Sequence, residues 1–211
     1  MNDQAAPGPI VLIADVVRSR ASFATSTAAL ARLARELDQR YADVRLARFD
    51  YTQGDELQGL LAPGADPFEA VLRPALAEPP LRLRWGIARG PVEPGRGPAT
   101  RRTGPAFVAA REAIRQAARR RVGLVARSGQ PAVDELLDDL APLLPMLLED
   151  LSARQREIGR LILLEGMRQA DVAARLNVTR ATVSVAAGRG RLAGIAGLAR
   201  ALRRLFGGPI P

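Results

Sequence analysis

The sequence predicts an α+β protein in two parts, a sandwich of order βαββαβ followed by a small all-α domain. A continuous apolar run over residues 10–14 is typical of a strand covered on both faces. Over residues 81–88 apolar residues alternate with polar or small ones, the period of a strand with one face on the core. Charge is uneven, because residues 151–211 hold 11 Arg and three acids, net +8, against 20 Arg and 19 acids, net +1, in residues 1–150.

The stretches between these landmarks predict the remaining elements of the sandwich. Gly54-Asp55 suits a type II′ turn between two hairpin strands, since Gly tolerates the first central position. Asp66 and Pro67 suit the cap and first position of a helix. In order, we expect a strand from residue 10, a helix over 25–41, strands over 44–51 and 56–62, a helix over 67–78, a strand over 81–87, a helix over 104–120 and a short strand over 122–125.

The amino-acid composition excludes several kinds of catalytic chemistry. The chain lacks Cys, His and Lys, so all 31 basic residues are Arg, and any catalysis must use carboxylates, hydroxyls, Arg and a hard metal such as Mg²⁺.

The start of the sequence has no secretory pattern and no apolar run is long enough to cross a bilayer, so we expect a cytoplasmic protein without a membrane partner. The expected units are a disordered N-terminus (1–9), the α+β domain (10–128), a helical linker (129–150) and a helix-turn-helix domain (151–211).

Residues 131–150 are rich in Leu, and Pro142 and Pro145 divide them into two short helices. Packing inside the protein explains such a Leu stripe. Any part of it that lies exposed would instead be the first candidate for the contact of a homodimer.

The basic C-terminal segment contains the signals of two short helices joined by a tight turn. Ser152 and Gln155 form a capping box for the preceding helix. Asn177 suits the left-handed residue that ends a helix, and Thr179 suits the cap of the next one. This arrangement predicts a helix-turn-helix that binds double-stranded DNA. The alternative is an ordinary helical hairpin with a solvated basic face.

In the DNA-binding interpretation, the start of the second helix enters the major groove beside its cap, Thr179. Arg180 would contact guanine, while Thr182 and Ser184 would contact base edges or phosphate. Arg189 and Arg191 would meet the DNA backbone. Proteins with this motif often bind two half-sites as dimers, so a homodimer is expected.

Two carboxylates of the α+β domain, Asp15 and Asp55, are candidate metal ligands. Asp15 ends the first apolar strand, and Asp55 lies at the hairpin turn. Taken singly they suit a strand cap and a turn residue, but together they could share a hard cation. Arg18, Ser19 and Arg20 follow the first strand and suit either a solvated loop or a contact to the phosphates of a nucleotide.

Five stretches, in this order along the chain, resemble the SatD family. They are VLIADVVRSR, TQGDELQGLL, LRWGIARG, GPAFVAAREAI and the terminal helix-turn-helix, and they span roughly residues 10–190. The first part also resembles the catalytic domain of class III nucleotidyl cyclases, which implies a ferredoxin-like, cyclase-like sandwich. The cyclase resemblance implies that Asp15 and Asp55 bind Mg²⁺ and that Arg111 stabilises the transition state. Without that resemblance, Arg111 would be an ordinary surface residue of a helix.

Two departures from the cyclase pattern guide the choice of function. The cyclase motif has Asn four residues before the Arg, where this chain has Phe107, and the Lys that reads adenine has no counterpart. We therefore expect a DNA-binding transcriptional regulator whose cyclase-like domain senses a nucleotide or metal. The alternative is a magnesium-dependent nucleotidyl cyclase or nucleotidyltransferase-like enzyme.

Overall fold

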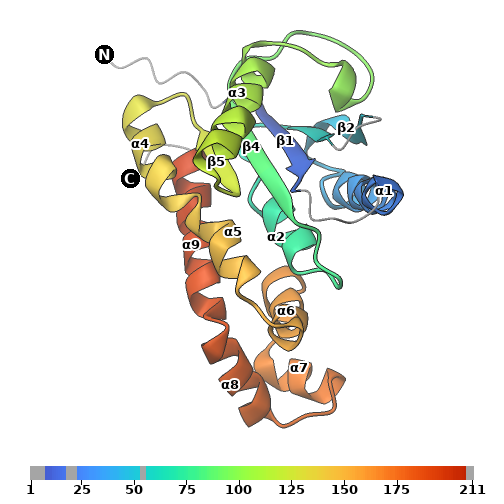
Figure 1. Ribbon diagram of the computed structural model, residues 1–211, viewed down its shortest axis with the longest axis vertical. Coiled ribbons are helices and arrows are strands. Elements are labelled where there is room, and N and C mark those ends of the chain that lie inside the picture. Colours follow the sequence, from blue (N-terminus) through green and yellow to red (C-terminus); the bar gives the residue numbers. More distant parts are fainter. Residues whose placement is uncertain (1–7, 18–22, 53–55, 208–211) are drawn as a thin grey trace.

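The computed structural model of the protein describes residues 8–17, 23–52 and 56–207. A five-stranded sheet with flanking helices forms one end of the molecule, and a group of short helices forms the other (Figure 1). The predicted α+β fold with a helical C-terminal region is confirmed. Most of the predicted disordered N-terminus lies outside the described residues.

The sheet has the strand order β2-β3-β1-β4-β5. The first four strands pair antiparallel and β5 is parallel to β4, so the last helix-strand unit extends the sheet beyond β4. Pairing of β2 with β3 continues to the hydrogen bond from the Thr52 amide to the Glu56 carbonyl, 3.0 Å. The predicted Gly54-Asp55 turn lies outside the described residues. The strands are β1 (Ile10–Val16), β2 (Arg45–Tyr51), β3 (Glu56–Leu61), β4 (Leu83–Arg89) and β5 (Leu124–Arg127).

The helices fall close to their predicted positions. The predicted helix over 67–78 is shorter at both ends, because α2 runs only from Glu69 to Ala75. The predicted cap Asp66 and first position Pro67 are wrong, since the cap position is Phe68; the Asp66 carboxylate accepts the amide of Phe68 at 3.0 Å just before the helix. The helices are α1 (Phe23–Arg40), α2 (Glu69–Ala75), α3 (Pro105–Arg120), α4 (Pro131–Leu140), α5 (Leu143–Glu149), α6 (Ala153–Gly159), α7 (Gln169–Arg175), α8 (Arg180–Arg189) and α9 (Leu192–Gly207), with a 3₁₀ turn at Ala99–Arg101 and a π turn at Arg160–Leu164.

Both faces of the sheet are covered by helices. On one face, α1 and α2 bury the even-numbered side chains of β1, such as Leu12, in the main core. On the other face, α3 covers the odd-numbered ones, such as Val11 and Ile13. Both faces of β4 are therefore buried. The alternating sequence pattern had predicted a strand with only one face on the core. Gly86 permits the burial of the second face, because a Cβ there would lie 2.3 Å from the Ala110 carbonyl oxygen of α3.

Helix α9 connects the two ends of the molecule. It begins beside α8, runs past α5 and α4, and ends near the sheet (Figure 1). There the Phe206 ring packs edge-on against Phe68, with 5.7 Å between ring centres, and the Phe206 carbonyl accepts from Arg89 at 2.9 Å. The main core is accordingly continuous from β1 to the short helices. None of the helices in the described part of the chain is long and apolar enough to span a membrane.

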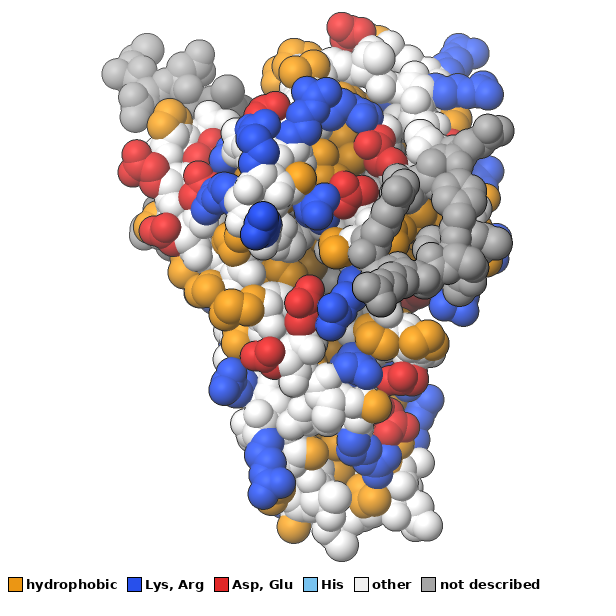
Figure 2. Space-filling model, viewed as in Figure 1, with side chains coloured by type: hydrophobic (Ala, Val, Ile, Leu, Met, Phe, Trp, Pro, Cys, Tyr) orange, Lys and Arg blue, Asp and Glu red, His pale blue; other side chains and the backbone are white. Residues whose placement is uncertain are grey.

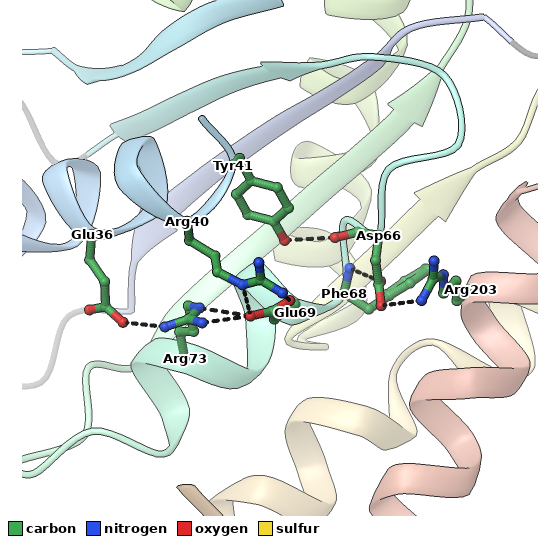
Figure 3. A network of polar contacts seen from close by, with 8 residues as sticks. All are labelled: Glu36, Arg40, Tyr41, Asp66, Phe68, Glu69, Arg73 and Arg203. Atoms are coloured by element: carbon green, nitrogen blue, oxygen red, sulfur yellow. Dashed lines mark hydrogen bonds and ion pairs between the residues drawn. The ribbon is translucent and has the colours of Figure 1, made fainter. Parts of the chain in front are cut away.

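A network of ion pairs joins α1 to α2 around Glu69 (Figure 3). Glu69 accepts from Arg40 Nε at 2.6 Å and from Arg73 Nη2 at 2.6 Å, and Arg73 also donates to Glu36 at 2.9 Å. Burial alone would raise the pKa of Glu69, but the hydrogen bonds from Arg40 and Arg73 outweigh it and hold the pKa below its ordinary value of 4.5.

Asp66 lies beside this network and links the sheet end to α9 (Figure 3). Its carbonyl accepts the Tyr41 hydroxyl at 2.6 Å, and its carboxylate lies 3.8 Å from Arg203 of α9. Burial raises the pKa of Asp66, only partly offset by the Phe68 amide and Arg203.

Replacing Gly86 tests the close approach of α3. Gly86→Ala should lower the free energy of unfolding by about 3 kcal/mol or more, because backbone atoms of α3 would have to move. Gly194→Ala in α9 is the control; a Cβ there meets nothing within 4 Å, so the variant should gain about 0.5–1 kcal/mol from helix propensity. Urea unfolding measures both, and equal stability of the two variants would contradict the expectation.

Replacing Glu69 tests the ion-pair network. Since the pKa of Glu69 is lower in the folded protein, its ionised form adds stability above pH 4.5, and this is lost as the pH falls through the folded pKa. Glu69→Gln should therefore cost about 1–3 kcal/mol at pH 7 and progressively less below pH 4.5. Urea unfolding from pH 3 to 7 gives this profile. A difference between wild type and variant that stays constant across the range would contradict it.

Candidate functional site

Three neighbouring strands place charged side chains in one row on the face covered by α3. Asp15 of β1 is the register partner of Glu56 on β3 and of Arg84 on β4. Side chains at directly opposed positions have Cβ atoms about 4.5–5.5 Å apart. Arg84 Nη1 lies 3.2 Å from Asp15 Oδ2. The row is half-buried, with side-chain exposures of 24% for Arg84 and 30% for Asp15.

Helix α3 adds Arg111 to this row. Its two terminal nitrogens each donate to one oxygen of Glu56 at 3.0 Å, the bidentate geometry that makes such pairs strong. Gln58, only 4% exposed, donates to the same carboxylate at 2.6 Å. The charged row thus contains two predicted site residues, Asp15 and Arg111. Glu56 links them, because it is the register partner of Asp15 and is hydrogen-bonded to Arg111.

This arrangement accounts for several residues of the stretch GDELQG. Glu56 and Gln58 form the polar contacts under α3. Gly59 is required on the opposite face, because a Cβ there would lie 2.1 Å from the Phe49 ring. Leu57, on the same face as Gly59, is buried in the main core. Much of this motif therefore serves packing on both faces of the sheet.

The other predicted ligands of the α+β domain cannot be placed. Asp55, Arg18, Ser19 and Arg20 lie outside the described residues. Within the described ranges, no three acidic side chains gather at one point as metal ligands. Asp15 and Glu56 supply two carboxylates side by side, a number that suits Mg²⁺ when phosphate oxygens complete the coordination. Both carboxylates are neutralised by Arg, so a cation would have to compete with Arg84 and Arg111.

Phe107 shows what replaces the Asn of the cyclase pattern. Its side chain is 7% exposed and belongs to the apolar cluster between α3 and the sheet. Arg111, one turn further along α3, reaches the charged row from the edge of that cluster. In this part of α3, Arg111 therefore contributes a guanidinium to the charged row, and Phe107 contributes apolar packing.

A second candidate surface lies on α8, at the far end of the molecule. Asn177 adopts the predicted left-handed conformation, with φ of 50°, between α7 and α8. The Thr179 hydroxyl caps α8 by accepting the Thr182 amide at 3.1 Å. Val183 and Ala187 are buried against the neighbouring helices. The local geometry predicted for a helix-turn-helix is thus present.

The outer face of α8 carries the predicted DNA contacts. Thr179, Arg180, Thr182, Ser184, Arg189 and Arg191 are all exposed. The hydroxyl groups of Thr179 and Thr182 lie 2.9 Å apart, so each already has one hydrogen-bond partner at the start of α8. Figure 2 shows Arg side chains on this helical end, beside few acidic ones.

The structure adds residues to this surface that the sequence did not single out. Val185 is 54% exposed on α8, an apolar group suited to the methyl group of thymine. A groove of about 540 Å³ runs between α6 and α8, lined by Val185, Thr182 and Arg189 on one side and Arg154 on the other. Arg154 lies 25 or more residues before the predicted contacts, and only the packing of α6 on α8 reveals it.

Comparison with known proteins gives two family matches. Residues 9–121, more than half of the chain, match the model of the SatD family, and residues 143–193 match Sigma-70, region 4. No curated protein matches the chain. One solved structure, a regulator of polyketide synthase expression from Bifidobacterium adolescentis, matches with 17% identity over 95% of this chain and 86% of that chain. The TM-score of this match is 0.26.

Proposed function

Because the chain belongs to the SatD family, as the sequence predicted, and matches Sigma-70, region 4 over the segment where the sequence predicted a helix-turn-helix, we propose that it is a DNA-binding transcriptional regulator. The observation that carries the proposal is the capped helix α8, in whose first half Arg180, Thr182 and Ser184 are all exposed. Helix-turn-helix proteins insert the start of this helix into the major groove. The net charge of +8 over residues 151–211 favours the phosphate backbone as partner.

Each contact on this surface has a distinct expected role. Arg180 suits bidentate recognition of guanine, and Val185 suits a thymine methyl group. Arg189 and Arg154 face each other across the groove between α6 and α8 and suit phosphates on either side of the helix. Arg191, just after α8, adds a further backbone contact.

Arg180 provides the test of DNA binding. With the best-bound fragment of a genomic library, Arg180→Ala should weaken binding about 10- to 100-fold, the cost of about 1–3 kcal/mol expected for one bidentate base contact. Arg204→Ala removes one equal charge from the end of α9 far from α8 and should change the affinity little. Fluorescence anisotropy at several salt concentrations measures both. Equal losses, or binding insensitive to salt, would contradict the assignment.

For the α+β domain, we propose that the charged row is a sensor for a nucleotide with Mg²⁺. Asp15 and Glu56 offer oxygen ligands for the cation, and Arg111 and Arg84 offer partners for phosphates. Both ion pairs are partly solvated, with Arg111 43% exposed, so phosphates can reach the guanidinium groups. Asp55, Arg18, Ser19 and Arg20 would complete the site as the sequence predicted. A bound Mg²⁺ would neutralise phosphate charge beside the carboxylates.

A sensor is preferred to the alternative, a magnesium-dependent cyclase or nucleotidyltransferase-like enzyme. In the cyclase pattern Asn and Arg act together on one helix, and here the Asn position is filled by the buried Phe107. Glu56 holds Arg111 through two hydrogen bonds. A phosphate would bind the same guanidinium in place of the Glu56 carboxylate, and such an exchange suits a sensor.

Thermal shift with nucleotides and Mg²⁺ tests the sensor. Nucleoside triphosphates with Mg²⁺ should raise the melting temperature of the wild type, since a ligand that binds only the folded state stabilises it. Asp15→Asn and Arg111→Ala should each abolish most of the shift. Arg115→Ala, on the same helix and 64% exposed, is the matched control and should retain it. The absence of any shift in the wild type, or an equal shift in all variants, would contradict the proposal.

Dimerisation and cellular location complete the proposed function. Part of the Leu-rich stripe is exposed, namely Leu136 (45%) and Leu143 (38%), together with Met146 (52%). Apolar side chains are visible over this part of the molecule in Figure 2. These residues support the proposed homodimer as its first candidate contact, in keeping with a regulator that binds two half-sites. A cytoplasmic location stays a prediction that suits a DNA-binding function.

A further inference from the structure

A cavity of about 60 Å³ lies where the sheet end of the molecule meets the short helices. Helix α2 and strand β4 form one side, through Val71 and Trp85, and helices α5 and α6 form the other, through Leu148 and Arg156. Trp85 and Leu148 are each at most 2% exposed, so these walls belong to the folded core. The cavity is separate from the charged row, because Trp85 lies on the opposite face of β4 from Arg84.

The lining combines apolar walls with a small excess of positive charge. Pro, Val, Leu and Trp side chains form most of the surface, and the charged residues are Arg82, Arg156 and Glu149. Such a mixture suits a ligand with an apolar body and one negatively charged group. A dianion without an apolar body would leave the walls unused.

Arg156 is the charged group best placed to bind an anion. Its side chain is only 16% exposed, and its Nη1 donates to the Leu151 carbonyl. Its Nη2 reaches Glu78 at 3.4 Å, a long contact to a carboxylate that is itself 64% exposed. Its Nε is buried and has no hydrogen-bond partner among the described residues. Because Nε has almost no accessible surface, Nη2, with its long contact to Glu78, is the donor that an anion would engage.

The volume limits the size of the ligand. At about 60 Å³ the cavity is far smaller than the roughly 300–1,000 Å³ pockets that hold drug-sized ligands, so only a small molecule fits. A carboxylate bound to a guanidinium uses two oxygens side by side. Beside the carboxylate, such a ligand has room only for a short hydrocarbon body.

We propose that this cavity binds a short-chain carboxylate, which engages Nη2 of Arg156 in place of Glu78 and whose apolar body packs against Trp85 and Leu148. The ligand would contact α2, β4, α5 and α6 at once. Helix α6 also forms one wall of the groove beside α8. Resting on the DNA-binding function proposed above, the ligand would therefore change the affinity for DNA by shifting α6 relative to the sheet.

Trp85 allows binding to be measured directly, because it is the only Trp in the chain. Sodium isobutyrate added to the full-length protein at constant ionic strength should change the Trp85 fluorescence and saturate. Isobutyramide, of similar shape but uncharged, and acetate, which lacks most of the apolar body, should each bind at least tenfold more weakly. No saturable change with isobutyrate, or equal affinity for isobutyramide, would overturn the proposal.

Two variants and one control locate the site. Arg156→Gln should weaken isobutyrate binding at least tenfold, whereas Arg154→Gln, on the same helix and paired with Glu157, should not. Ala75→Leu fills the cavity from α2 while retaining Arg156, and should also abolish binding. If Arg156→Gln does not fold, the isobutyrate affinity of Ala75→Leu alone tests the site. Undiminished binding by Ala75→Leu would overturn the site.

Measuring DNA affinity with and without isobutyrate separates the two proposals. A change of at least threefold in wild type, absent in Ala75→Leu, supports the regulatory role. Saturable binding of isobutyrate with unchanged DNA affinity would overturn that role while leaving the carboxylate site intact. Loss of DNA binding in Arg180→Ala is independent of isobutyrate, so failure of the DNA-binding proposal would be recognised separately.

Discussion

The close contact between α3 and β4 is the constraint on which the α+β part of the molecule depends. The helix backbone lies so near the strand that position 86 has no room for a side chain. Interiors are packed as densely as organic crystals, so this distance fixes where every other side chain of α3 can reach. It seals the second face of the sheet with Phe107 and Ile114, and it brings Arg111 over Glu56.

The charged row follows from that packing. A guanidinium and a carboxylate half-buried at the edge of an apolar cluster stabilise each other only when both are held in register. Here the antiparallel pairing of β1 with β3 and β4 aligns Asp15 with Glu56 and Arg84, and α3 supplies Arg111. The result is a set of ion pairs with balanced charge that a phosphate or a cation can enter only by exchanging partners. Such exchange would be the physical basis of the proposed sensing, since binding would rearrange contacts between α3 and the sheet.

The two ends of the molecule share one core, and this bears on how a signal could reach the DNA-binding helices. Helix α9 packs beside α8 at its start, and near its end Phe206 and Arg203 contact Phe68 and Asp66, just before α2. Helix α6 is joined to the sheet end through Arg156 and Glu78. A displacement of α2 would act first on α5 and on the π turn after α6, which α2 contacts directly, and β4 is joined to α9 through the hydrogen bond from Arg89 to the Phe206 carbonyl.

The sequence by itself determined the elements and the local turns. Periodicity predicted the strands and helices, and the caps at Ser152 and Thr179 and the left-handed Asn177 were all predicted correctly, because each depends on residues a few positions apart. The family also followed from contiguous motifs, whereas the DNA contacts assigned to the exposed residues of α8 stay a prediction. Whether Asp15 and Asp55 share a cation stays a prediction, since Asp55 lies outside the described residues.

Only the tertiary structure decided which distant residues meet. The pairing of Glu56 with Arg111, the place of Arg84 beside Asp15, the approach of Arg154 to α8 and the cavity beside Trp85 all join residues tens of positions apart. Sequence periodicity specifies which face of an element is apolar, but not the partner against which that face packs. That choice is made by side-chain volume across the core, as Gly86 and Gly59 illustrate, and it can be read only once the helices lie on the sheet.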